Sequence, residues 1–141
     1  MAQEEKSLLL QDLCARVYYG VLFMAYDDEI NEPVELLSIN PKRDKPLEID
    51  DGYDENSSTY CSLEDVKPYL RSLSSITEEE KKEAHRLFTV LYDRNDAICG
   101  IQINSFVQLD KVIEWLNKHH FDYRGLIPKG LALEALEGMY G

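Results

Sequence analysis

The sequence contains no apolar stretch near the roughly 18 residues that a membrane-spanning helix needs. Its most apolar early segment, Leu8 to Leu10, is followed at once by Gln11 and Asp12. That run is too short for the apolar region of a secretory signal peptide. We therefore expect a cytoplasmic protein that does not enter the membrane.

Cysteine is also scarce. Cys14, Cys61 and Cys99 are far apart, odd in number and form no C-x-x-C pair. This arrangement argues against a disulfide framework and fits a reducing compartment. We interpret all three as small buried apolar residues.

The common short motifs of catalytic and nucleotide-binding sites are missing. There is no G-x-S-x-G nucleophile motif, and Gly125 and Gly130 lack the Lys-Ser/Thr pair of a phosphate-binding loop. An EF-hand starting at Asp54 fails, because Thr59 stands where a glycine is required and Asp65 where a glutamate is expected. The one alternative that remains for calcium is a loose, weak cation site in residues 50–55. We therefore expect no catalytic residues and no cofactor.

Basic residues are outnumbered by acidic ones, 15 to 27, which gives a net charge of −12. Residues 27–55 hold eleven acidic and three basic residues, and so carry −8 of that total. Such a field repels phosphate backbones, so we expect no direct binding of DNA or RNA. This acidic region suits binding to a basic protein partner. In a more specific form of this hypothesis, the acids imitate DNA and occupy a nucleic-acid-binding protein. The alternative is that the acids serve only solubility. The candidate partner-binding acids are Asp50, Asp51, Asp54 and Glu55.

Periodicity of apolar residues is what the sequence does contain. Three segments have helical spacing, residues 7–19, 77–92 and 105–120, and Thr77 with Glu80 fits a capping box. Five shorter segments have the pattern of strands. They are residues 21–26, 34–39, 47–49, 58–61 and 97–103, of which the first two are close enough to form a hairpin. We expect an α+β fold with a small antiparallel sheet or open barrel of about five short strands and three main helices.

At 141 residues the chain has about the length of one domain. A boundary near Leu73 would divide it into residues 1–73, a helix plus a β-sheet, and residues 74–141, mainly helical. Each half would then have a thin core. We therefore expect a single α+β domain over residues 1–141.

An apolar segment follows the third predicted helix. It contains Leu126, Ile127, Leu131 and Leu133. Two glycines and a proline between positions 125 and 130 disfavour a continuous helix there. Two interpretations stay open: the segment packs on its own chain, or it docks on a partner or on a second copy, which would make a homo-oligomer.

His119, His120 and Asp122 are the one group that suggests a small metal-dependent enzyme, with His85 as a further ligand. Adjacent histidines on a helix project about 100 degrees apart and rarely share an ion. Cationic groups at the end of a helix also complement its dipole. We therefore expect no metal here and keep the enzyme as an alternative.

Three blocks of the sequence resemble one protein family. They are residues 10–21 (LQDLCARVYYGV), 65–79 (DVKPYLRSLSSITEE) and 120–135 (HFDYRGLIPKGLALEA). These blocks are similar to a family of uncharacterised proteins from gut Bacteroidales. The resemblance implies an association with prophage or other mobile elements and implies no known activity. It does not extend to residues 26–60, where most of the acids lie.

These observations predict a non-enzymatic intracellular protein that binds or regulates another protein, as an accessory of a mobile element. A structural or assembly component is a third interpretation beside the metal-dependent enzyme.

Overall fold

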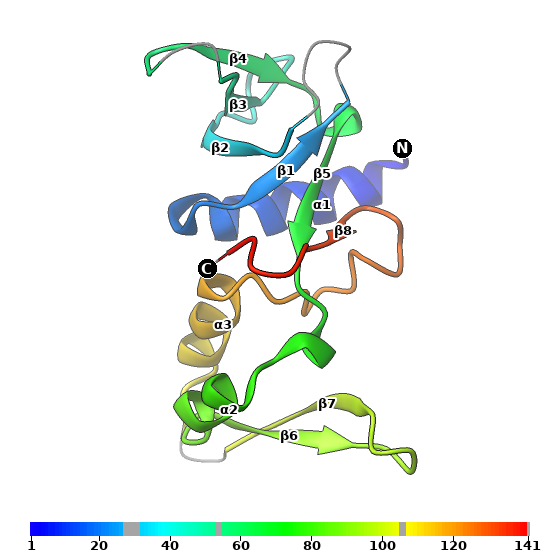
Figure 1. Ribbon diagram of the computed structural model, residues 1–141. Coiled ribbons are helices and arrows are strands. Elements are labelled where there is room, and N and C mark those ends of the chain that lie inside the picture. Colours follow the sequence, from blue (N-terminus) through cyan, green and yellow to red (C-terminus); the bar gives the residue numbers. More distant parts are fainter. Residues whose placement is uncertain (27–31, 53–54, 105–106, 141) are drawn as a thin grey trace.

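The structure, a computed structural model, describes residues 1–26, 32–52, 55–104 and 107–140. Within these residues the chain forms three α-helices, three 3-10 helices and eight strands (Figure 1). In chain order they are α1 (Gln3–Arg16), η1 (Val17–Tyr19), β1 (Leu22–Ala25), β2 (Val34–Ile39), β3 (Leu47–Asp50), β4 (Ser58–Cys61), η2 (Leu63–Asp65), β5 (Val66–Leu70), η3 (Leu73–Ser75), α2 (Glu78–Ala84), β6 (Phe88–Tyr92), β7 (Ile98–Ile103), α3 (Leu109–Lys118) and β8 (Leu133–Glu134).

Six of the strands form one sheet in the order β4-β3-β2-β1-β5-β8. Neighbouring strands are antiparallel except β5 and β8, which run parallel. The α+β class and the three main helices are confirmed, and so is the hairpin of β1 and β2. The prediction of about five strands in an antiparallel sheet or open barrel is wrong in its detail. The large sheet is mixed and open, and β6 and β7 form a separate two-stranded sheet.

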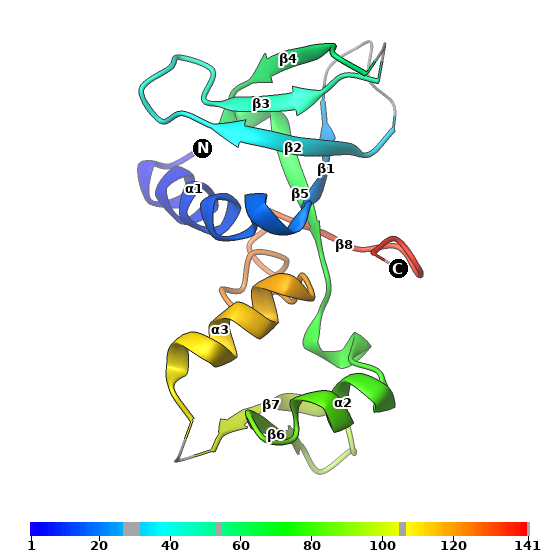
Figure 2. The same cartoon turned by 90° about the vertical axis from the view of Figure 1, so that its left-hand side faces the viewer.

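Helix α1 packs against one face of the six-stranded sheet (Figure 2). Leu9 and Leu13 are one helical turn apart, and both are fully buried in the same apolar cluster as Phe23 of β1 and Leu47 of β3. Strands β2 and β3 begin with alternating buried and more exposed residues, as expected for a sheet with one covered face. We call this cluster the first core. Its buried residues are Leu9, Leu13, Val21, Phe23, Ala25, Val34, Leu36, Leu47, Ile49, Cys61, Val66, Leu70, Leu126, Leu131 and Ala132.

Residues 88–92 are a strand and not the end of a helix. The capping box of Thr77 and Glu80 is confirmed, but α2 ends after seven residues. β6 then pairs antiparallel with β7. The prediction of one helix over residues 77–92 is therefore wrong in its second half. The run Phe-Thr-Val-Leu-Tyr is rich in β-branched and aromatic residues, which favour a strand when a partner strand is available.

The β6–β7 hairpin, α2 and α3 enclose a second core. Its buried residues are Ile76, Ala84, Phe88, Val112, Trp115, Leu116 and Phe121. Helix α3 starts at Leu109, later than predicted, and residues 105 and 106 of the predicted helix lie outside the described residues. In Figures 1 and 2 this second core lies below the first, and the chain passes between the two after β5 and after α3.

The environments of the cysteines differ from the prediction. Cys61 is buried as expected, but Cys14 and Cys99 are exposed, so the expectation of three buried thiols is wrong for two of them. Among the described residues, no helix has the length and apolar character needed to cross a membrane.

Candidate functional site

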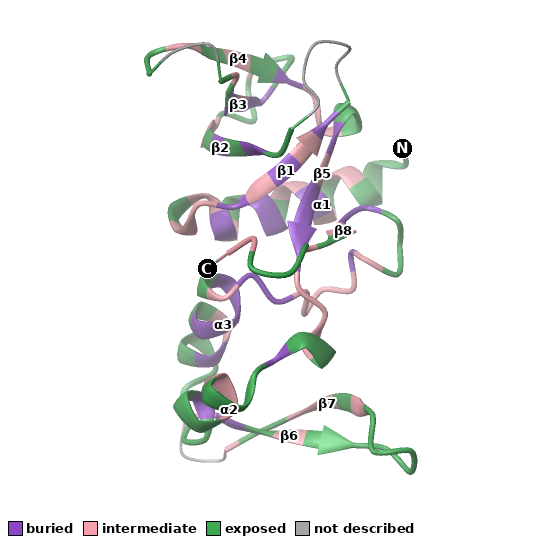
Figure 3. Cartoon of the chain, viewed as in Figure 1, coloured by how far each residue is buried: buried purple, intermediate pink, exposed green. Residues whose placement is uncertain are grey.

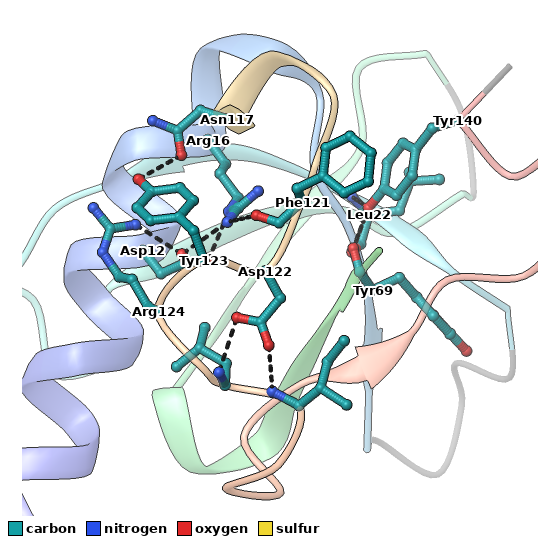
Figure 4. Close-up of polar contacts among 12 residues, drawn as sticks. Asp12, Arg16, Leu22, Tyr69, Asn117, Phe121, Asp122, Tyr123, Arg124 and Tyr140 are labelled. Carbon is teal, nitrogen blue, oxygen red and sulfur yellow. Dashed lines mark hydrogen bonds and ion pairs between the residues drawn. The ribbon is translucent and has the colours of Figure 1, made fainter. Parts of the chain in front are cut away.

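A fully buried ion pair within α1 also bonds the segment that follows α3 (Figure 4). Arg16 Nε donates to Asp12 Oδ2 at 2.9 Å and Arg16 Nη2 donates to Asp12 Oδ1 at 3.1 Å, and both side chains are 0% exposed. Arg16 Nη2 also donates to the backbone oxygen of Phe121 at 2.6 Å. Arg124 Nη1 donates to Asp12 Oδ1 at 2.8 Å. Asp12 therefore accepts from two guanidinium groups and fixes the segment that follows α3 on α1.

The carboxylate of Asp122 holds the turn that starts the C-terminal segment. Its two oxygens accept the backbone N–H groups of Leu126 and Ile127, each at 2.9 Å (Figure 4). Beside it, the Tyr123 hydroxyl donates to Asn117 Oδ1 at 2.8 Å. Both oxygens of Asp122 are thus used to order the local backbone.

His120 is buried and stacked on Tyr140, the last aromatic residue of the sequence. Its side chain is 4% exposed, its backbone has a φ of 61°, and its ring centroid lies 3.7 Å from that of Tyr140. Burial, together with the nearby charge of Arg16, lowers the pKa of His120 to about 4. The imidazole is therefore neutral at physiological pH.

The Tyr140 hydroxyl lies between β1 and β5, just beyond their shared ladder (Figure 4). It donates to the backbone oxygen of Tyr69 at 2.6 Å and accepts the N–H of Leu22 at 3.0 Å. Burial raises the pKa of Tyr140 to about 12. Tyr140 thereby bridges two strands at the point where their own pairing stops.

His119 faces away from this group and toward α2. Its Nδ1 lies 3.3 Å from Glu80 Oε2, and its Nε2 lies 3.5 Å from Glu83 Oε1. Arg71 donates to both oxygens of Glu80, each at 2.7 Å. Burial alone would raise the pKa of Glu80, but the hydrogen bonds from Arg71 and Thr77 outweigh it and lower that pKa to about 2.

The residues of the suggested metal site do not converge. His119 turns to the acids of α2, His120 stacks on Tyr140, and Asp122 caps a turn. Glu80 and Glu83 approach opposite nitrogens of the His119 ring, an arrangement that leaves no shared position for an ion. In residues 1–26, 32–52, 55–104 and 107–140, no three His, Cys, Asp or Glu side chains are placed to hold a metal. His85 is exposed at the end of α2, with Nδ1 2.7 Å from the backbone oxygen of Lys82.

Three of the four predicted acids lie at the end of β3 or between β3 and β4, the two strands at one edge of the six-stranded sheet (Figure 3). Asp50 ends β3 and is exposed, Asp51 is half-buried, and Glu55 is exposed in the connection to β4, whereas Asp54 lies outside the described residues. Asp50 Oδ1 accepts the N–H of Gly52 at 2.9 Å, and Asp51 Oδ2 accepts the Ser57 hydroxyl at 2.8 Å. We call Asp50, Asp51 and Glu55 the acidic surface.

Strand β4 beside the acidic surface is an edge strand with an exposed aromatic residue. Among the strands that the structure describes, β4 is hydrogen-bonded to β3 alone, and Ser58 of β4 is opposite Asp50. Tyr60 is 45% exposed, and the guanidinium carbon of Arg43 lies 4.4 Å from the centre of its ring. A carboxylate group, an open backbone edge and a large aromatic side chain thus occur together.

The apolar residues of the C-terminal segment lie mainly inside the fold. Leu126 is 0% and Leu131 5% exposed in the first core, while Ile127 and Leu133 are half-buried. β8 adds to the large sheet by parallel pairing with β5. The segment therefore packs on its own chain, and a partner reaches Leu126 or Leu131 only if the segment is displaced.

Sequence reasoning missed the two ionic clusters that hold the fold. Asp12 and Arg16 are four residues apart on a helix, a spacing that signals an ion pair, but this spacing does not reveal burial. The contacts of Arg124 with Asp12 and of Arg71 with Glu80 join segments distant in sequence, and no local pattern predicts them.

Comparison of the chain with models of protein families, with curated proteins and with solved structures found no match in any of the three.

Proposed function

We propose that this protein acts without catalysis, by binding a basic protein partner through the acidic surface and the adjoining edge strand β4. The observation that carries the proposal is that exposed carboxylates and an exposed tyrosine lie next to an edge strand of the sheet. Asp50 and Glu55 are exposed, Asp51 is half-buried, and Tyr60 projects from an edge strand next to them.

Each part of this combination contributes to recognition in a different way. The carboxylates attract a basic partner over several ångströms and orient its approach. An edge strand offers unpaired N–H and C=O groups to an extended segment of the partner. Tyrosine is enriched among the residues that carry most of the binding energy at protein interfaces. Long-range attraction, backbone pairing and a side-chain anchor are therefore available on one surface.

The roles of the other ionisable groups support a non-catalytic function. His120 and Asp122 serve the C-terminal segment, and His119 faces the carboxylates of α2. These are structural contacts of groups that otherwise make the best candidates for a reaction. The resemblance in the sequence adds the proposal that the partner acts in the biology of a prophage or another mobile element.

Affinity capture with charge-matched variants tests the proposal. Wild-type protein, the triple variant Asp50→Asn, Asp51→Asn, Glu55→Gln, and a control are each used to capture proteins from a cell extract. The amide substitutions keep an oxygen that accepts the hydrogen bonds of Gly52 and Ser57. The control is the triple variant Glu4→Gln, Glu5→Gln, Glu79→Gln, which removes the same charge from exposed positions on α1 and α2.

We expect a protein with net positive charge to be retained by the wild type and by the control and lost by the acidic-surface variant. Retention of the same protein by all three forms contradicts the proposal. Loss from both triple variants alike shows that total charge, and not this surface, decides the binding.

A further inference from the structure

Tyr60 and Glu48 lie next to each other on the face of the large sheet that is turned away from α1. They are cross-strand partners in β4 and β3, so their side chains point to the same face. The alternate residues Leu47, Ile49 and Cys61 point to the other face and belong to the first core. Figure 2 shows β2, β3 and β4 side by side. An aromatic ring and a carboxylate are therefore neighbours outside the core.

The carboxylate of Glu48 is held in place from both neighbouring strands. Ser38 Oγ of β2 donates to its Oε1 and Ser58 Oγ of β4 donates to its Oε2, each at 2.8 Å. The hydrogen bonds from Ser38 and then Ser58 lower the pKa of Glu48, so the group is ionised at neutral pH. A carboxylate oxygen accepts more than one hydrogen bond, so both oxygens can also accept from a guanidinium group. The carboxylate is thus ordered before any partner arrives.

The chain places one of its own guanidinium groups at this pair. Arg43 lies in the connection between β2 and β3, and its guanidinium carbon is 4.4 Å from the centre of the Tyr60 ring. Its charge also helps to lower the pKa of Glu48. A planar guanidinium stacks on aromatic rings and binds carboxylates through two parallel hydrogen bonds, whereas the ammonium group of lysine is a point charge. The contact of Arg43 shows that an arginine side chain fits this pair.

Arg43 is held there by weak contacts. Its Nη2 donates to the backbone oxygen of Pro46 at 3.2 Å, and its Nε is buried without a hydrogen-bond partner among the described residues. An unpaired buried donor is unfavourable, and a cation–π contact near the surface stabilises only modestly. The loop itself is closed by backbone bonds, from Asn40 N to Pro46 O at 2.9 Å and from Arg43 N to Asn40 O at 3.1 Å. The side chain can therefore leave Tyr60 while the loop stays closed.

We propose that Tyr60 and Glu48 recognise an arginine of the basic partner, and that Arg43 occupies this place in the free protein and is displaced on binding. The inference rests on the proposed function and specifies its partner as a basic segment that contains arginine. A segment that pairs with β4 brings alternate side chains to the same face as Tyr60, one strand spacing away. Arg43 competes with every incoming cation, and a cation without a guanidinium group gains too little to replace it.

Titration with two short peptides of equal length, one of arginines and one of lysines, tests this specificity without the cellular partner. The amide and ring resonances of Tyr60 in NMR spectra report binding at the site. We expect the arginine peptide to bind the wild type about tenfold more tightly. Tyr60→Phe keeps the ring and should retain this preference, whereas Tyr60→Leu should lose most of it. Equal dissociation constants of the two peptides for the wild type, or an unchanged preference in Tyr60→Leu, overturn the inference.

Displacement of Arg43 is tested by removing its side chain. Arg43→Gln and the control Lys42→Gln each remove one positive charge from the same connection, and Lys42 is exposed. Because only the first variant frees the Tyr60 ring from its guanidinium, we expect it to bind the arginine peptide about threefold more tightly than the control. Equal or weaker binding by Arg43→Gln contradicts the displacement.

The peptide titration and the affinity capture separate this inference from the proposed function. Peptides that bind without a preference for arginine overturn the inference but leave capture of a basic protein by the acidic surface unaffected. A captured protein that binds the acidic-surface variant as well as the wild type overturns the proposed function, while the arginine preference of Tyr60 and Glu48 is measured independently of it.

Discussion

Arg16 carries a positive charge into a part of the protein that water does not reach, and its neighbours determine whether that charge is tolerated. Removing an ion from water costs several kcal/mol, and an ion pair offsets the cost only with good geometry and further hydrogen bonds. Asp12 supplies two hydrogen bonds, and the backbone oxygen of Phe121 supplies a third. The stability of the fold is therefore most sensitive to a substitution that removes only one partner of this pair.

Asp12→Asn tests this dependence at constant side-chain size. The variant leaves the Arg16 guanidinium buried without a counter-charge and weakens the contact of Arg124. We expect the free energy of unfolding to fall by about 3–5 kcal/mol, measured by urea denaturation. Glu78→Gln is the control, since it removes one partner of the exposed pair with Lys81 and should leave stability nearly unchanged. Equal effects of the two variants contradict this account of the buried pair.

His120 makes stability depend on pH in a defined window. Its pKa is about 4 in the folded chain against an ordinary 6.5, so between these values the unfolded chain binds a proton that the folded chain does not. The free energy of unfolding therefore decreases as the pH falls from 6.5 to 4, by roughly 3 kcal/mol in total.

Denaturation at a series of pH values measures this slope. His120→Asn removes the titrating group and suits the positive φ at this position, because asparagine adopts the left-handed conformation more readily than most residues. We expect the slope between pH 6.5 and 4 to flatten in the variant. An unchanged slope assigns the effect to another group.

The end of the chain acts on the sheet through one hydroxyl group. Tyr140→Phe keeps the ring stacked on His120 but removes the group that bonds Leu22 and Tyr69. Two backbone groups then lose their partner, so we expect a loss of about 1–3 kcal/mol and faster exchange of the Leu22 amide hydrogen. Tyr18→Phe, at a side chain that is 88% exposed, is the control and should change neither quantity.

The elements that sequence predicts well are those whose signals are local. The strands predicted at residues 34–39 and 58–61 have the observed bounds, and the capping box at Thr77 fixes the start of α2. β5 is not among the predicted strands; it contains Pro68, which cannot donate to a ladder. β6 was assigned to a helix, because Leu87, Phe88 and Leu91 also fit a helical period.

The parts of the candidate site also differ in how well the sequence predicts them. The acidic surface is visible in the sequence as a local excess of charge, and Asp50 and Glu55 are indeed exposed. The open edge of β4 and its exposed Tyr60 depend on strand order, which no local pattern specifies.

At the scale of the whole molecule, Arg71 links the two cores. Its backbone pairs with His120 and Asp122, its side chain binds Glu80, and its guanidinium carbon lies 4.3 Å from the ring centre of Phe121 in the second core. β5, which ends just before Arg71, belongs to the first core. These contacts favour a single domain over residues 1–141 rather than a division near residue 73.

Cooperativity of unfolding tests the single domain. Trp115 is the only tryptophan and lies in the second core, so its fluorescence reports that core alone. We expect its unfolding midpoint to coincide with that of far-ultraviolet circular dichroism, which reports the whole chain. In Arg71→Ala we expect the second core to unfold first, at a lower urea concentration. Separate midpoints in the wild type contradict a single domain.

Hydrogen exchange of the complex with the captured partner tests the proposed binding surface most directly. We predict slower exchange at β4 and at Asp50 and Asp51, with little change at the amides of α3. Protection confined to α3 or to the C-terminal segment, with β4 exchanging as in the free protein, contradicts the account.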